Sequence, residues 1–122
     1  MPIDFLTEEQ KQNYGCYAAE PNEVQLSRYF ILDENDLTFI AQRRGDQNRL
    51  GIALQLTSVR FLGAFLSDLT LIPQNVQTFV ATQLSISRTD ILAEYAKREP
   101  TRWEHYAQIK KYYYYHEFGE FP

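Results

Sequence analysis

The sequence predicts an all-α fold, a compact bundle of about six or seven short helices that contains a helix-turn-helix-like unit. Capping boxes or prolines open several segments, and apolar residues recur at helical spacing inside them. β-Branched residues are scattered, and the alternation that marks strands is not sustained. A length of 122 residues with 44% hydrophobic side chains predicts one domain, residues 1–122, with a modest core.

Each of the first three predicted helices begins at a recognisable N-terminal signal. Thr7 opens a capping box and a short helix that ends near Gly15. Pro21 opens the second helix. Asp33 caps the third helix, which ends at Gly45. The apolar faces of the second and third helices are Val24, Leu26, Tyr29 and Phe30, and Leu37, Ile40 and Ala41.

The fourth predicted helix is expected to lie at the centre of the bundle. Asp46 is its predicted N-terminal cap. Apolar residues form two stripes along it, which is typical of a helix with neighbours on more than one side. Gly51 costs roughly 1 kcal/mol relative to alanine, which predicts a close contact with another helix. The two stripes are Leu50, Ala53, Leu54, Thr57 and Phe61, and Ile52, Leu56 and Val59.

Three further helices are predicted after the loop Ser67–Ile72, which is the longest expected break. Pro73 opens the fifth helix. Either Ser87 or Thr89 caps the sixth. Thr101 opens a second capping box and a seventh helix, which runs into a tyrosine-rich end.

The net charge of −4 is unevenly distributed. Residues 1–36 contain eight acidic and two basic residues, and the rest of the chain carries a small excess of positive charge. This distribution argues against a strong nonspecific coat on DNA and favours a limited cationic patch. The single Cys16 excludes an intrachain disulfide and a four-cysteine zinc site. No apolar run is long enough to span a bilayer, so we expect a soluble, cytoplasmic protein.

The candidate functional residues gather where the third predicted helix meets the fourth. A helix, a tight turn with glycine and a second helix is the layout of a helix-turn-helix reader, in which the first turn of the second helix meets base edges. Arginine binds phosphate, and arginine, asparagine and glutamine pair with base edges. Arg60 follows Arg49 by about three helical turns, so the two share a face. The candidate DNA contacts here are Arg43, Arg44, Gln47, Asn48, Arg49 and Arg60.

The same junction has a purely structural interpretation. Arg43 and Arg44 suit the C-terminus of a helix through its dipole alone, and Asp46 is an ordinary cap. A glycine turn between helices occurs in any helical bundle. The spacing by itself therefore leaves both interpretations open.

A second basic segment lies in the seventh predicted helix. Arg102, Lys110 and Lys111 are candidate phosphate contacts that would flank the first cluster. The alternative is a solvated helix face with Glu–Lys pairs. Trp103 and Tyr106 are expected to belong to the core.

The aromatic C-terminal end carries two interpretations as well. The tyrosines of residues 112–115 stack on unpaired bases or pack against other parts of a longer protein, of which this chain is the first domain. His116-Glu117 is half of a zinc-protease motif, but the second histidine is missing. No phosphate-binding glycine loop or nucleophile elbow is present, so the sequence supports no enzyme, metal site or cofactor within this chain.

Three stretches of the sequence, residues 1–7, 43–63 and 101–105, resemble the N-terminal domain of transposases of the bacterial Tn-three family. The resemblance implies a helical domain that recognises the terminal inverted repeats of a transposon, so that double-stranded DNA is the partner. It also implies that strand cleavage and transfer belong to a distant C-terminal region, where three acidic residues bind magnesium. No catalytic residue is therefore assigned to this chain.

Two hypotheses follow from the sequence. The first is sequence-specific binding of transposon ends, with Arg43, Arg44 and Arg60 on phosphates and Gln47, Asn48 and Arg49 on bases. The alternative is a protein-interaction or dimerisation module of the same transposase, whose partners are its remaining domains or a second copy.

Overall fold

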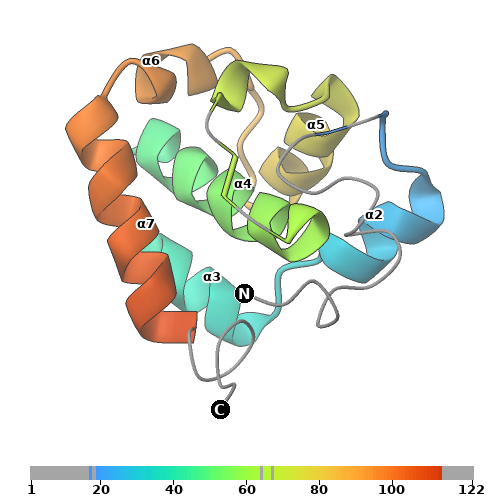
Figure 1. The fold of residues 1–122 in the computed structure, drawn as a ribbon, viewed down its shortest axis with the longest axis horizontal. Coiled ribbons are helices and arrows are strands. Elements are labelled where there is room, and N and C mark those ends of the chain that lie inside the picture. Colours follow the sequence, from blue (N-terminus) through green and yellow to red (C-terminus); the bar gives the residue numbers. More distant parts are fainter. Residues whose placement is uncertain (1–16, 18, 64, 67, 114–122) are drawn as a thin grey trace.

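The computed structural model describes residues 17, 19–63, 65–66 and 68–113 (Figure 1). This part of the chain contains six α-helices and one 3₁₀-helix and no strand, which confirms the all-α prediction. The helix predicted from Thr7, Cys16 and His116-Glu117 lie outside the described residues. The elements are α2 (Glu23–Tyr29), α3 (Glu34–Ala41), α4 (Asp46–Leu62), the 3₁₀-helix η2 (Leu69–Leu71), α5 (Gln74–Gln83), α6 (Leu92–Ala96) and α7 (Glu99–Tyr113).

Helix α4 crosses the middle of the molecule, as the two apolar stripes predicted (Figure 1). It contacts α2, α3, α5, α6 and α7. Every residue from Leu50 to Val59 is buried, whichever way its side chain points. Because the helix is covered on all sides over this stretch, the other helices are arranged around it, and only its two ends reach the surface.

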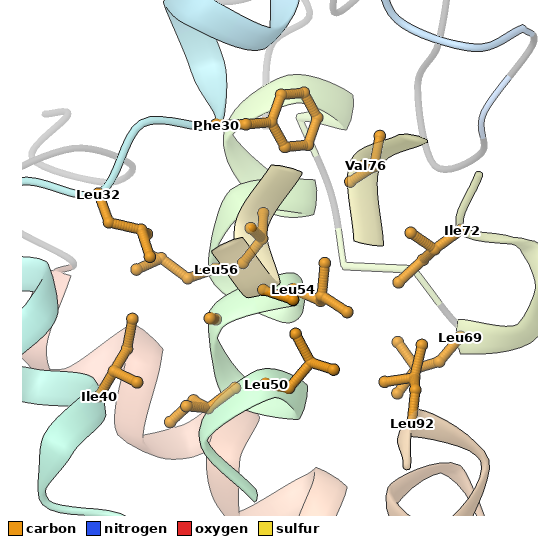
Figure 2. Packing of buried hydrophobic residues seen from close by; sticks show 14 of the residues in the cluster. Phe30, Leu32, Ile40, Leu50, Leu54, Leu56, Leu69, Ile72, Val76 and Leu92 are labelled. Atoms are coloured by element: carbon orange, nitrogen blue, oxygen red, sulfur yellow. The ribbon is translucent and has the colours of Figure 1, made fainter. Parts of the chain in front are cut away.

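The hydrophobic core surrounds α4 (Figure 2). Leu50, Leu54 and Leu56 project from this helix toward different neighbours. One group of partners comes from α3 and the segment before it, and another from η2, α5 and α6. Core residues labelled around α4 in Figure 2 are Phe30, Leu32, Ile40, Leu69, Ile72, Val76 and Leu92.

The helix caps agree with the sequence at α3 but not at α4. Asp33 caps α3, and it exchanges hydrogen bonds with Asp36 three residues later, as a capping box does. Asp46 was predicted to cap α4, but this is wrong, because Asp46 is the first residue of the helix and Gly45 is the cap. Gly45 has φ of 79°, a region that glycine enters without strain.

The predicted starts of the last two helices are also wrong. Helix α6 begins at Leu92 with no side-chain cap, rather than after Ser87 or Thr89. Helix α7 begins at Glu99, so Thr101 is inside it. Pro100 is compatible with this start, because the N–H that proline lacks has no partner in the first turn of a helix.

Helix α7 buries a narrower face than expected. Tyr106 is buried, and its hydroxyl donates a hydrogen bond of 2.6 Å to the Leu66 carbonyl. Trp103 was predicted to be core, but 60% of it is exposed. The centres of the Trp103 and Tyr106 rings lie 5.1 Å apart, and the planes of the two rings are at 75°. The buried face of α7 is His105, Tyr106, Ile109 and Tyr113.

The close contact predicted at Gly51 is confirmed, and its partner is Tyr95 of α6. A Cβ atom on Gly51 would lie 2.4 Å from three atoms of the Tyr95 ring. The hydroxyl of Tyr95 accepts a hydrogen bond from the amide of Gln55 and lies 2.7 Å from Nδ1 of His105. This buried chain of polar groups joins α4, α6 and α7.

Acid titration of His105 is expected to weaken this junction. Burial, helped by the positive charge of Arg43, lowers the pKa of His105 from 6.5 to about 4. The unfolded chain therefore binds a proton between pH 6.5 and 4 that the folded chain does not, so stability present above pH 6.5 is lost as the pH falls through this range. The full shift corresponds to roughly 3 kcal/mol, and we expect a loss of about 1–2 kcal/mol after local relaxation.

Chemical denaturation from pH 7 to pH 4 measures this loss. In His105→Gln the slope of unfolding free energy against pH is expected to flatten over the same range, because glutamine does not titrate. An unchanged slope in this variant would show that other groups cause the pH dependence.

Candidate nucleic-acid interface

The α3–α4 turn, residues 42–45, and the first turn of α4 together hold five of the predicted contact residues. Within the α3–α4 turn, the N–H of Arg43 donates to the Ile40 carbonyl at 3.0 Å. No side chain caps the N-terminus of α4. A helix N-terminus without such a cap offers its N–H groups and its positive dipole end to an anion. This N-terminus is therefore a candidate site for a phosphate.

The two amide side chains of the first turn of α4 fold back on the connection. Asn48 donates a hydrogen bond of 2.8 Å from Nδ2 to the Arg44 carbonyl. The Gln47 side chain lies over Gly45, since a Cβ atom there would be 2.9 Å from Oε1 of Gln47. Both amides must turn outward to reach base edges, so they support the turn in the unbound domain.

Two arginines, one in the α3–α4 turn and one in the first turn of α4, reach solvent. Arg44 is exposed. Arg49 is 40% exposed along its side chain, and its guanidinium lies 3.7 Å from the carboxylate of Asp46. An exposed ion pair of this length contributes little, about 0–1 kcal/mol, so a phosphate competes with Asp46 at small cost.

Arg43 is half-buried and stacks on an aromatic ring. Its guanidinium carbon lies 4.4 Å from the centre of the Phe39 ring. Its Nε has no hydrogen-bond partner within the described part of the chain. Burial lowers the pKa of Arg43, although arginine stays charged. A partly desolvated cation of this kind is stabilised by an incoming anion.

Arg60 was predicted to contact phosphate beside Arg49, and in the structure its guanidinium is paired with Asp36. Its two terminal nitrogens donate to the two carboxylate oxygens of Asp36, at 3.0 and 2.8 Å. The side chains of Arg60 and Asp36 are only 14% and 2% exposed. Arg60 does follow Arg49 along one side of α4, but α3 and α7 cover that side at the C-terminal end. We therefore assign Arg60 a structural role.

Asp36 is held by more than this ion pair. The hydroxyl of Tyr113 donates to it at 2.8 Å, and the N–H of Asp33 donates at 3.0 Å. Burial alone would raise the pKa of Asp36, but the hydrogen bonds from Arg60, Asp33 and Tyr113 outweigh burial and lower this pKa. Sequence reasoning missed this network, whose partners lie 24 and 77 residues from Asp36.

The predicted basic flank on α7 is divided between two hollows. Arg102 and Lys110 line a hollow of about 410 Å³ together with Phe65, Trp103 and Tyr106. Lys111 lies in a different groove, with Arg43. Arg102, Lys110 and Lys111 therefore do not form one surface.

The larger groove runs between α3 and the C-terminal part of α7. Its volume is about 870 Å³. Helix α3 lies beside the C-terminal end of α7 (Figure 1). The Phe39 ring contacts the rings of Tyr112 and Tyr113. Because Arg43 belongs both to this groove and to the α3–α4 turn, the two surfaces are continuous.

The burial of α4 limits how a helix-turn-helix-like unit would act here. A typical recognition helix lies in the major groove along its exposed face. Helix α4 has no such face from Leu50 to Val59. Its approach to DNA is thus restricted to its N-terminal turn, Asp46–Arg49.

Within the described ranges, no three His, Cys, Asp or Glu side chains lie close enough to hold a metal ion. None of the helices combines the length and the apolar character needed to cross a membrane.

Comparison with known proteins identifies the family. Residues 5–121 match a family described as a domain of unknown function, DUF4158. The chain belongs to this family. It is 68% identical over 122 residues to the transposase for transposon gamma-delta of Escherichia coli strain K12. It is 33% identical over 110 residues to the transposase for transposon Tn1546 of Enterococcus faecium, and 36% identical over 99 residues to that for Tn501 of Pseudomonas aeruginosa.

These matches cover the DUF4158 chain but little of its relatives. All of this chain but 12% of the gamma-delta transposase is aligned. The corresponding shares are 90% and 11% for Tn1546, and 80% and 10% for Tn501. The resemblance to Tn-three family transposases is confirmed, and the chain corresponds to roughly a tenth of such a protein.

Proposed function

We propose that this domain binds the terminal inverted repeats of a transposon as part of a transposase. One observation carries the proposal. Arg44 and Arg49 reach solvent, and Arg43, Gln47 and Asn48 lie beside them at a helix N-terminus without a side-chain cap. This arrangement supplies phosphate contacts and base-reading side chains at one place. The similarity to the gamma-delta transposase supplies the context of transposon DNA.

The arrangement favours an end-on approach to the duplex. The arginines would hold backbone phosphates on either side of a groove, and the N-terminus of α4 would point into it. Gln47 and Asn48 would turn outward when bases replace their contacts with the turn. Strand cleavage and transfer, with magnesium, would belong to parts of the transposase outside this chain. Transposition would take place on DNA in the bacterial cytoplasm.

Fluorescence anisotropy with an inverted-repeat duplex and a scrambled duplex tests the proposal. Preference for the repeat, with log affinity falling linearly against log salt, is the expected result. Binding to neither duplex would overturn it and favour the interaction module. The exposed Trp103, with its hollow, is the surface that such a module would use.

Arg49→Ala is expected to weaken binding to the repeat by about 1–3 kcal/mol, the range for one good base contact. The fold should be unaffected, because among the described residues the Arg49 side chain makes only an exposed ion pair of 3.7 Å. Arg88→Ala is a matched control, since it removes one exposed arginine from the connection between α5 and α6. Equal losses in both variants would show that net charge, rather than a contact by Arg49, governs affinity.

A further inference from the structure

The groove between α3 and α7 combines an aromatic wall with positive charge, as a second DNA site would. We propose that it takes one unpaired nucleotide of a DNA strand, with the base against Tyr112 and the phosphate on Arg43 and Lys111. This inference rests on the proposed function, because the groove adjoins the α3–α4 turn through Arg43. It adds a different substrate feature, a single-stranded nucleotide beside the duplex.

An aromatic wall supplies the surface for the base. The rings of Phe39 and Tyr112 lie 4.8 Å apart at 34°. Tyr112 is 44% exposed, although the next residue, Tyr113, is buried. An exposed ring supported from behind by a second ring is held in place before the ligand arrives. Stacking on such a ring tolerates any base, because every base has a π face.

Positive charge supplies the site for the phosphate. Arg43 is half-buried on Phe39 and makes no salt bridge within the described part of the chain, although the charge of Glu104 favours its charged form, and Lys111 is exposed at the same groove. Two acids line the groove: Asp36 is compensated by Arg60 and Tyr113, and Asp33 accepts a hydrogen bond from the N–H of Asp36. An anion entering the groove would be held by Arg43 and Lys111.

Amide groups supply partners for the edge of a base. Gln42 and Gln108 line the groove. Oε1 of Gln108 is buried and has no hydrogen-bond partner within the described part of the chain, whereas Nε2 donates to Glu104 at 3.1 Å. A buried acceptor without a partner is costly, and a rotation of this amide toward the groove would let an amino group of a base satisfy it.

The size and the wall exclude a base pair that remains stacked. A groove of about 870 Å³ is of the size that accommodates a small molecule or a nucleotide. Bases within a duplex present only their edges, since their faces are covered by neighbouring pairs. The occupant must therefore be unpaired, as in a single-stranded extension or beside a nick.

The full chain and 2-aminopurine, a base analogue whose fluorescence falls on stacking, test the inference. Three probes are compared: a blunt inverted-repeat duplex, the same duplex with a short single-stranded extension that carries 2-aminopurine, and the extension strand alone. Quenching of the extension and tighter binding than to the blunt duplex are expected. If 2-aminopurine is quenched neither in the extended duplex nor in the extension strand alone, the inference is overturned, whether or not the blunt duplex binds.

Variants separate the groove from the turn. Tyr112→Ala is expected to weaken binding of the extended duplex about 5- to 100-fold, the range for one lost stack, and to leave the blunt duplex unchanged. Tyr112→Phe keeps the ring and should bind normally. Lys111→Gln, at an exposed position, should also weaken binding of the extended duplex only. Arg49→Ala should instead weaken binding of the blunt duplex, so a failure of the proposed function is seen with a different probe.

Two outcomes would assign the groove differently. If dTMP displaces the extension at equal concentration of nucleotide, the site takes free nucleotides and the assignment to DNA is overturned. If Tyr112→Ala and Lys111→Gln keep wild-type quenching and a wild-type circular dichroism spectrum, the extension binds elsewhere and the assignment is likewise overturned.

Discussion

Arg60→Ala is expected to lower the free energy of unfolding by about 3–5 kcal/mol, the usual result of removing one partner from a buried ion pair. The carboxylate of Asp36 would lose both hydrogen bonds from the guanidinium, of 3.0 and 2.8 Å, while it stays in the interior. Urea denaturation of the wild type and the variant measures the difference.

A second variant shows that the charge left behind causes this loss. Arg60→Met combined with Asp36→Asn removes both charges and keeps most of the volume, so it should be more stable than Arg60→Ala alone. If Arg60→Ala is as stable as the wild type but loses affinity for the inverted repeat, Arg60 is a phosphate contact and the structural role is wrong. Affinity should be measured on the folded fraction, below the denaturation temperature.

The same network gives acid unfolding a second stage. Because the pKa of Asp36 is lowered in the folded chain, its contribution to stability is present above the ordinary aspartate pKa of 3.8 and is lost as the pH falls through the lower folded value. The stage that comes from His105 lies at higher pH, between 6.5 and 4. The two networks can thus be separated by pH as well as by mutation.

The features that were predicted correctly from the sequence depend on residues close together in the chain. The cap at Asp33 needs only the next three residues, and the central position of α4 follows from its two apolar stripes. The basic and amide residues of the α3–α4 turn and of the first turn of α4 all lie between Arg43 and Arg49, so they stay close together. The caps predicted at Asp46 and Thr101 failed because each helix begins earlier than predicted, α4 after Gly45 and α7 at Glu99.

Features that depend on residues far apart could not be predicted. Arg60 is exposed on an isolated helix, and it is buried only because α3 brings Asp36 and α7 brings Tyr113 to it. The groove likewise requires α3 and α7 to lie together, which no spacing in the chain shows. Trp103 belongs to this class, since its exposure is decided by which face of α7 meets α4 and α6.

Gly51→Ala is expected to destabilise the domain by about 2–3 kcal/mol, although alanine usually stabilises a helix by roughly 1 kcal/mol relative to glycine. The new methyl group would lie 2.4 Å from the Tyr95 ring, well inside van der Waals contact. The ring cannot easily withdraw, because it is fully buried and its hydroxyl is held between Gln55 and His105. Urea denaturation of the variant gives the loss.

The Tyr95→Ala background reverses the expected sign. Removing the ring itself costs about 3–5 kcal/mol, but it opens the space above residue 51. Gly51→Ala in that background should then be neutral or stabilising by up to about 1 kcal/mol, because only the helix propensity remains. The difference between the two backgrounds isolates the contact of α4 with α6. If Gly51→Ala has the same effect with and without Tyr95, glycine is required at this position for a reason other than the ring.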